Sequence, residues 1–98
     1  MMAIWWPFGD VRMPEISRFF GVVIAMYYND HAPPHFHARY GGQKALISID
    51  KPTILEGSLS PRVLGLVVEW AAMHRAELAE NWERSRRDAP LEKIDPLE

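Results

Sequence analysis

Three of the four histidines in this chain of 98 residues lie close together, at His31, His35 and His37. If His35 and His37 lie on one strand, their side chains share a face and their Cα atoms are roughly 6.6–6.8 Å apart. This separation suits two imidazoles that bind one metal ion or that contact one phosphate group. His31 precedes a pair of prolines, and it can fold back toward the other two histidines as a third group.

Acid–base catalysis is one chemistry that these histidines allow, because the ordinary pKa of histidine, about 6.5, permits proton exchange near neutral pH. This hypothesis makes His35 and His37 the base and the acid, with His31 beside them. RNA or a nucleotide would then be the substrate, and the activity would be ribonuclease-like.

Three basic residues near the histidines are the predicted phosphate ligands. Arg39 and Lys44 are expected to lie opposite each other on a hairpin, where like charges destabilise the pairing by about 0.2–1 kcal/mol. An anion between them would remove this repulsion, and Arg18 offers a guanidinium that can bind phosphate oxygens in a fork. The alternative is that Arg39 and Lys44 only protect the sheet from pairing with other chains.

Metal binding is a second chemistry for the same histidines. A divalent ion such as zinc would be held by His31, His35 and His37, with Asp30 or His74 available as a further ligand. The simplest alternative assigns no chemistry to the histidines, which would then cap backbone groups and form hydrogen bonds with water. The sequence leaves these alternatives open.

A hairpin is expected to position the histidines. The segments 35–40 and 43–49 flank Gly41-Gly42, a pair that suits a two-residue turn with positive φ. This turn predicts that Tyr40 pairs with Gln43 and His35 with Ser48. One face of the hairpin is then apolar and faces the core: Phe36, Ala38, Tyr40, Ala45, Ile47 and Ile49. The other face is expected to be polar, basic and exposed to solvent: His35, His37, Arg39, Lys44, Leu46 and Ser48.

The rest of the chain predicts an α+β fold. Ile16–Tyr28 favours a strand with a bend at Gly21, and Ile54–Glu56 favours a further short strand. Ser60-Pro61 then begins a helix, with Ser60 as its N-cap. The helix either continues for roughly 25 residues or breaks near His74. We expect a small antiparallel sheet of four to five strands packed on a long C-terminal helix.

Composition indicates one domain. The apolar fraction of 48% supports a single core, and the net charge of −2 argues against a protein that coats nucleic acid. The chain has no cysteine, and its longest apolar run, Phe19–Tyr28, is about half of the ~20 residues that a membrane helix needs. We expect a cytoplasmic protein without membrane association, in which residues 1–12 form an N-terminal extension and residues 13–98 form the domain.

The chain resembles a small bacterial family called domain of unknown function 4160. Four segments carry the resemblance: MPEISRFFG at 13–21, MYYNDHAPPHFH at 26–37, LEG at 55–57 and EW at 69–70. Members of this family are commonly encoded beside a second small protein, in an arrangement like that of toxin–antitoxin pairs. The resemblance implies a toxin-like component with a small protein partner, and it places the histidine segment and Arg18 in the family's signature.

Three functions therefore follow as expectations. The first is a toxin-like component of a bacterial toxin–antitoxin-type module that acts on RNA through the histidine and basic surface. The second is a module that binds a protein or nucleic acid without catalysis. The third is a histidine metal-binding protein. Under each of these functions, the sequence allows a homo-oligomer.

Overall fold

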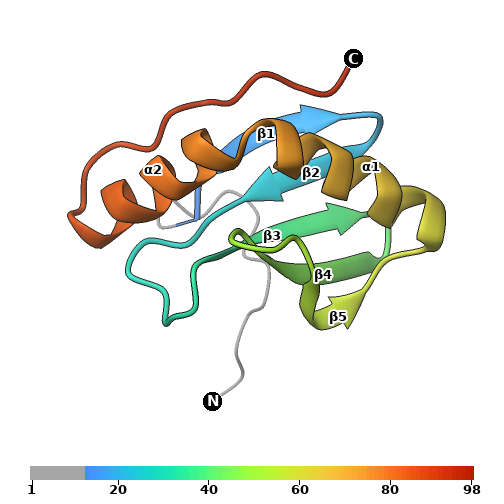
Figure 1. Ribbon diagram of the computed structural model, residues 1–98, viewed down its shortest axis with the longest axis horizontal. Helices are drawn as coiled ribbons and strands as arrows, with labels where there is room; N and C mark the ends of the chain where they lie inside the picture. The colour runs from blue at the N-terminus through green and yellow to red at the C-terminus, as the bar shows by residue number, and fades with distance from the viewer. Residues whose placement is uncertain (1–12) are drawn as a thin grey trace.

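The computed structural model describes residues 13–98 (Figure 1). Five antiparallel strands in the order β1-β2-β3-β4-β5 form one sheet, and two helices follow. The elements are β1 (Glu15–Phe19), β2 (Val22–Ala25), β3 (His35–Tyr40), β4 (Gln43–Ser48), β5 (Ile54–Ser58), α1 (Pro61–Met73) and α2 (Arg75–Arg86). The predicted α+β class and antiparallel sheet are confirmed.

The first hairpin corrects the prediction of one strand over Ile16–Tyr28. The chain reverses at Phe20 and Gly21, whose φ angles are 49° and 84°, and the segment therefore forms both β1 and β2. All four residues of β2 are buried, so no polar residue interrupts the apolar pattern to reveal the turn. A Cβ atom on Gly21 would lie 3.1 Å from Cε1 of Tyr40, so this turn also needs the space that glycine leaves.

The second hairpin, β3–β4, has the predicted register. All six residues of each strand pair as expected, from His35 with Ser48 to Tyr40 with Gln43. The apolar face contributes Phe36, Ala38, Ala45 and Ile47 to the core. The expectation that the other face is open to solvent is wrong for three of its residues, because His35, His37 and Leu46 are buried.

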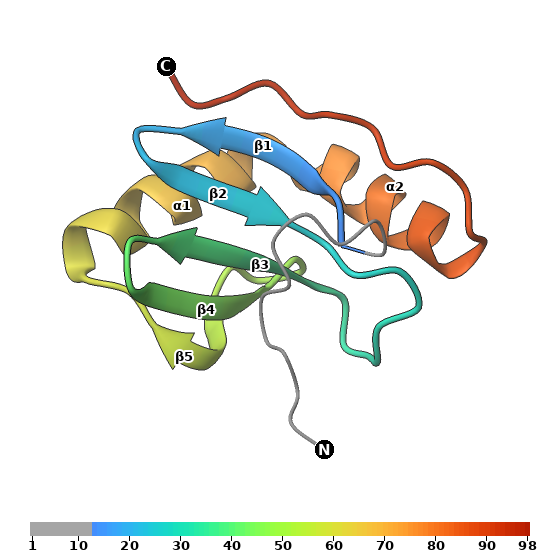
Figure 2. The ribbon, with the colours of Figure 1, turned by 180° about the vertical axis from the view of Figure 1, so that it is seen from behind.

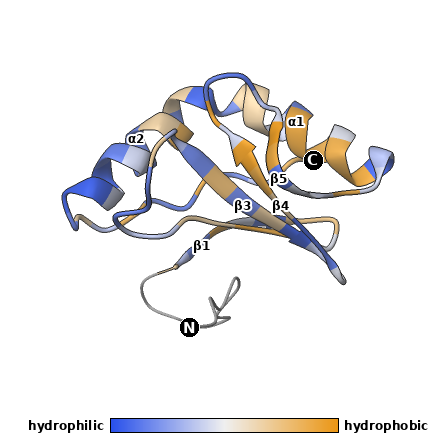
Figure 3. Ribbon diagram, turned by 90° about the horizontal axis from the view of Figure 1, so that it is seen from below, coloured by the Kyte–Doolittle hydropathy of each residue, from blue (hydrophilic) through white to orange (hydrophobic). Residues whose placement is uncertain are grey.

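The C-terminal helix divides at His74, which is one of the two outcomes that the sequence leaves open. His74 leaves helical geometry (φ −122°, ψ 29°), and its N–H donates to the carbonyl oxygens of Trp70 and Ala71. Ser60 is the N-cap of α1 and Pro61 its first residue, as predicted. Both helices cover one face of the sheet as a second layer, and Figure 3 shows that α2 is the more hydrophilic of the two.

Trp70 of α1 lies at the centre of the core between these layers. Its ring centroid is 5.3 Å from that of Phe19 and 5.8 Å from that of Phe36. The side chain of Trp70 is fully buried, and its aromatic neighbours make this part of the contact between α1 and the sheet apolar. Burial of an aromatic side chain contributes on the order of 2–3 kcal/mol.

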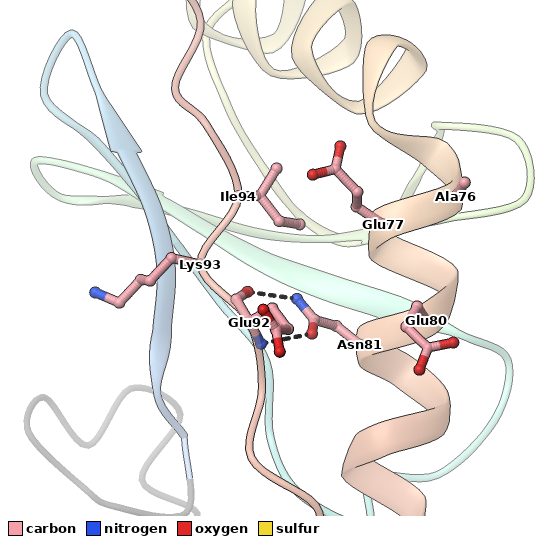
Figure 4. Close-up of a pocket in the computed structure, with 7 residues that line it drawn as sticks. All are labelled: Ala76, Glu77, Glu80, Asn81, Glu92, Lys93 and Ile94. Carbon is pink, nitrogen blue, oxygen red and sulfur yellow. Dashed lines mark hydrogen bonds between the residues drawn. The ribbon is translucent and has the colours of Figure 1, made fainter.

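The segment after α2 runs back along the helices and the outer edge of β1 (Figures 1 and 2). The buried Asn81 amide holds it, since Nδ2 donates to the Glu92 carbonyl (2.9 Å) and Oδ1 accepts from the Glu92 N–H (2.8 Å), as Figure 4 shows. The Ile94 N–H then donates to the Ile16 carbonyl. The sequence gives no periodic signal for this segment, and it covers the edge of β1.

Two further expectations concern the membrane and the N-terminus. Over residues 13–98, no helix combines the length and apolar character that crossing a bilayer requires. The predicted N-terminal extension, residues 1–12, lies outside the described residues.

Candidate metal centre

The loop between β2 and β3 carries the first residues of the candidate site and is fixed to the end of α2. The Asn29 N–H donates to the Ser85 carbonyl (3.2 Å), and the Tyr28 hydroxyl donates to the Ala89 carbonyl (2.9 Å). The Ala32–Pro33 peptide bond within the loop is cis. The contacts of Tyr28 and Asn29 attach the loop to the end of α2 and place Asp30 beside the start of β3.

Asp30 brings the histidines together. Its Oδ2 atom lies 2.9 Å from Nε2 of His35 and 3.4 Å from Nε2 of His37. Its Oδ1 atom accepts from the backbone N–H of His31 and lies 2.9 Å from Nδ1 of the same residue. One carboxylate therefore contacts all three histidines that the sequence singles out.

The three histidines differ sharply in their exposure. The relative exposure of His35 is 1% and that of His37 is 4%, whereas the side chain of His31 is 82% exposed. The indole of Trp82 from α2 lies against His35, with ring centroids 5.3 Å apart, and the ring of Tyr27 meets His37 edge to face. His35 and His37 thus form the buried part of the cluster, and His31 borders it on the solvent side.

The two nitrogens of His35 both face oxygen atoms that can only accept hydrogen bonds. Nδ1 lies 2.7 Å from the Pro33 carbonyl oxygen, and Nε2 faces the Asp30 carboxylate. A neutral imidazole that donates from Nδ1 to Pro33 would direct the lone pair of Nε2 at the carboxylate. A positive charge between Nε2 and Asp30 removes this repulsion, and either a proton or a metal ion can supply it.

The pKa shifts describe the cluster when a proton supplies that charge. Burial alone would raise the pKa of Asp30, but hydrogen bonds from His35, His37 and the His31 backbone lower it far below its ordinary value. Burial would lower the pKa of His35, but its bonds to Asp30 and Pro33 outweigh burial and raise it. Burial dominates at His37 and lowers its pKa. In the metal-free cluster, Asp30 therefore favours its carboxylate form, and His35 binds a proton more readily than His37 does.

The donor set and its dimensions fit a divalent metal ion. One donor atom each from Asp30, His35 and His37 lie within 4.8 Å of one another. With bonds of about 2.0–2.1 Å, neighbouring donors around a tetrahedral zinc ion are about 3.3–3.4 Å apart. The distance between His37 Nε2 and Asp30 Oδ2 already has this value, and the distance for His35 is slightly shorter. The Nδ1 contact of His35 with Pro33 is the outer contact that orients metal-binding histidines in proteins.

Of the two further ligands that the sequence offers, Asp30 lies in the cluster and His74 does not. The Nδ1 atom of His74 pairs with the Glu77 carboxylate one turn into α2, and its ring packs on Trp70. Trp82 and the Pro33 carbonyl are parts of the site that the spacing of residues does not reveal. Trp82 reaches the site through a contact between distant segments, and Pro33 contributes only a backbone acceptor. Neither kind of contact produces a spacing pattern in a sequence.

The predicted phosphate ligands lie in a row across the sheet, and Arg39 follows His37 two positions later on the same face of β3. Arg18 pairs with Val23, Val23 with Arg39, and Arg39 with Lys44. The Arg18 side chain is 57% exposed and forms a two-point contact with the Glu15 carboxylate, at 2.8 and 3.0 Å. Binding of phosphate by Arg18, Arg39 and Lys44 stays a prediction, as does catalysis by the histidines.

The fold and the site define a small α+β protein with a buried cluster of one aspartate and two histidines. The chain belongs to the domain of unknown function family DUF4160, which matches residues 21–83 and confirms the resemblance seen in the sequence. The matched range contains β2 to β5, the loop and most of both helices, and therefore all of the cluster. Neither the curated proteins nor the solved structures provide a significant match to this chain.

Proposed function

We propose that this protein binds one divalent transition-metal ion, of the zinc class, through Asp30, His35 and His37. The observation that carries the proposal is the convergence of three ligand-type atoms within 4.8 Å, from two buried histidines and the half-buried Asp30. Nitrogen and carboxylate donors in this number suit zinc and its neighbours in the first transition series. A hard cation such as Mg²⁺ would instead favour oxygen donors.

A metal ion and a proton compete for the same nitrogen of the cluster. A metal ion needs the neutral form of His35, and the Nδ1–H contact with Pro33 already directs Nε2 toward the other two donors. The ion competes with a proton for Nε2 of His35, whose pKa is raised by Asp30 and Pro33, so the apparent affinity rises with pH. His31 on the solvent side supplies the fourth ligand, or water takes that position.

The role that this site supports best is structural. His35 and His37 belong to β3 and are nearly inaccessible, while Asp30 belongs to the loop. An ion bound to all three would tie the loop to the sheet. Stabilisation by such binding follows the ratio of free metal concentration to dissociation constant and reaches about 4 kcal/mol at a thousandfold excess.

The test is elemental analysis combined with reconstitution. Untagged protein purified without chelator should contain about one equivalent of zinc-class metal, or take up one when zinc is added to the metal-free form. Asp30→Asn and His37→Asn should lose this equivalent, whereas His74→Gln, which alters a histidine outside the cluster, should keep it. Less than a tenth of an equivalent in reconstituted wild type would refute the proposal.

Toxin-like action on RNA and a small protein partner both stay predictions. Acid–base catalysis at His35 and His37 would require contact with a phosphodiester, and 1% exposure of His35 prevents such contact in the described conformation. RNA incubated with wild type and with the double variant His35→Ala/His37→Ala tests this function. Cleavage that only the wild type supports would favour catalysis over a structural ion.

A further inference from the structure

A cleft with a volume of about 440 Å³ opens between the loop that follows Asp30, the end of β4 and the start of α2. Its apolar walls come from Pro33 and Pro34 on one side and from Ile49 and Ala79 on the others. This volume lies in the range of roughly 300–1,000 Å³ that is usual for small-molecule sites. The prolines are stiff, so this wall needs no ordering when a ligand binds.

Two opposite charges line the same cleft. Arg75 begins α2, and Asp50 follows the end of β4. Both side chains are exposed, and within residues 13–98 neither forms an ion pair or a side-chain hydrogen bond. The half-buried residue Ser48 also lines the cleft, and its hydroxyl has no such partner in this part of the chain either. The cleft thus combines an apolar wall with a cation, an anion and a hydroxyl group that all remain available.

We propose that this cleft binds a small zwitterion with an apolar body, the chemical class of the apolar α-amino acids. The ligand carboxylate would pair with the Arg75 guanidinium, which can donate two parallel hydrogen bonds. The ligand ammonium group would pair with Asp50, and the apolar side chain would lie against Pro33 and Pro34. A purely anionic ligand is disfavoured by Asp50 and a purely cationic ligand by Arg75.

The cleft touches the metal cluster at one residue but does not depend on it. Pro33 lines the cleft, and its carbonyl oxygen accepts the Nδ1–H of His35. The metal donors lie on the other side of the His35 ring, at Nε2. Failure of metal binding would therefore leave this proposal intact, and the reverse also holds.

The experiment is an NMR titration of ¹⁵N-labelled wild type with L-leucine as the probe. We expect saturable shifts of the Ser48, Ile49 and Ala79 amides, with a dissociation constant on the order of 1 mM. N-acetyl-leucine lacks the ammonium group and leucine amide lacks the carboxylate, so each should bind at least tenfold more weakly. Arg75→Gln and Asp50→Asn should weaken leucine binding by the same factor, while Arg62→Gln, on an exposed arginine of α1, should not.

Three results would overturn the proposal. The first is the absence of saturable shifts in wild type at leucine concentrations on the order of 10 mM. The second is equal binding of leucine and N-acetyl-leucine, which would show that Asp50 plays no part. The third is unchanged leucine binding by Arg75→Gln when circular dichroism shows that this variant is folded.

Discussion

Nε2 of His35 lies 2.9 Å from Oδ2 of Asp30, and His35 has only 1% of its surface exposed. Because Nδ1 of His35 faces the Pro33 carbonyl oxygen, a neutral imidazole cannot donate to both acceptors, and the pair needs a second proton or a metal ion. The proposal of a metal centre and the titration of the metal-free protein both follow from this requirement, because a metal ion and a proton compete for the same nitrogen.

The Asp30 carboxylate is predicted to stabilise the metal-free fold. Asp30→Asn removes the charge that accepts from His31, His35 and His37, and hydrogen bonds to charged groups contribute about 1.5–3 kcal/mol each. We expect the free energy of unfolding to fall by about 1.5–3 kcal/mol in urea titrations followed by tryptophan fluorescence. Asp50→Asn, which alters an exposed aspartate, serves as the control and should change stability by less than about 0.5 kcal/mol. An equal loss in the two variants would contradict this account.

The pKa values of the two buried histidines are predicted to be shifted in opposite directions. In the metal-free protein, the pKa of His35 should lie above the ordinary value of 6.5 because of Asp30 and Pro33, and that of His37 below it because of burial. NMR of the imidazole nitrogens as a function of pH measures both values. If His37 were the more basic of the two, the assignment of charge within the cluster would be wrong.

The pH dependence of stability follows from the His35 shift. Because the folded-state pKa is raised, the stabilisation is fully present below the unfolded pKa of about 6.5 and disappears as pH rises through the folded pKa. The difference in unfolding free energy between wild type and His35→Gln, both metal-free, should therefore be largest below about pH 6 and decrease toward alkaline pH. A difference that increases with pH would contradict the prediction.

The lowered pKa of Asp30 affects the free energy of unfolding at acidic pH. The Asp30 carboxylate stabilises the fold fully above pH 3.8, the approximate pKa of this group in the unfolded chain. This stabilisation is lost as the pH falls toward the much lower pKa of Asp30 in the folded protein. We expect acid unfolding of wild type to begin at lower pH than that of Asp30→Asn, as measured by circular dichroism. If the two proteins unfold at the same acidic pH, the pKa of the Asp30 carboxylate is not lowered in the folded protein.

The amide of Asn81 is predicted to hold the C-terminal segment in place. Asn81→Ala leaves the N–H and carbonyl groups of Glu92 without their partner, which costs about 1–3 kcal/mol. Faster hydrogen exchange at Glu92 and Ile94 should accompany the loss of stability. Glu92→Ala is the matched control, because the bonds to Asn81 involve the Glu92 backbone and survive this change. Similar exchange rates in both variants would argue against the role of the amide.

The sequence predicts the β3–β4 register because Gly41-Gly42 marks the turn and side chains alternate along both strands. It also predicts that His35 and His37 share a face. The alternation of side chains along a strand does not show whether other parts of the protein cover a face of the sheet. The burial of His35 and His37 could therefore not be predicted. The contact between His35 and Trp82 joins segments more than forty positions apart along the chain, and no local pattern reports such a contact.

Three further features of the fold are also difficult to predict, each for a different reason. The turn at Phe20 and Gly21 lies inside an apolar run, because β1 and β2 both contribute to the core. The segment after α2 has neither helical nor strand periodicity, and single side chains such as Asn81 hold it. The break at His74 replaces only a few helical hydrogen bonds, so apolar spacing continues through it.

The most direct test of the central claim is X-ray absorption spectroscopy at the zinc edge of the reconstituted protein. We predict a first shell of nitrogen and oxygen donors at about 2.0–2.1 Å, with the multiple scattering of at least two imidazoles. His37→Asn should lose the contribution of one imidazole. A wild-type spectrum with fewer than two imidazoles, or an unchanged spectrum in His37→Asn, would contradict a metal centre formed by Asp30, His35 and His37.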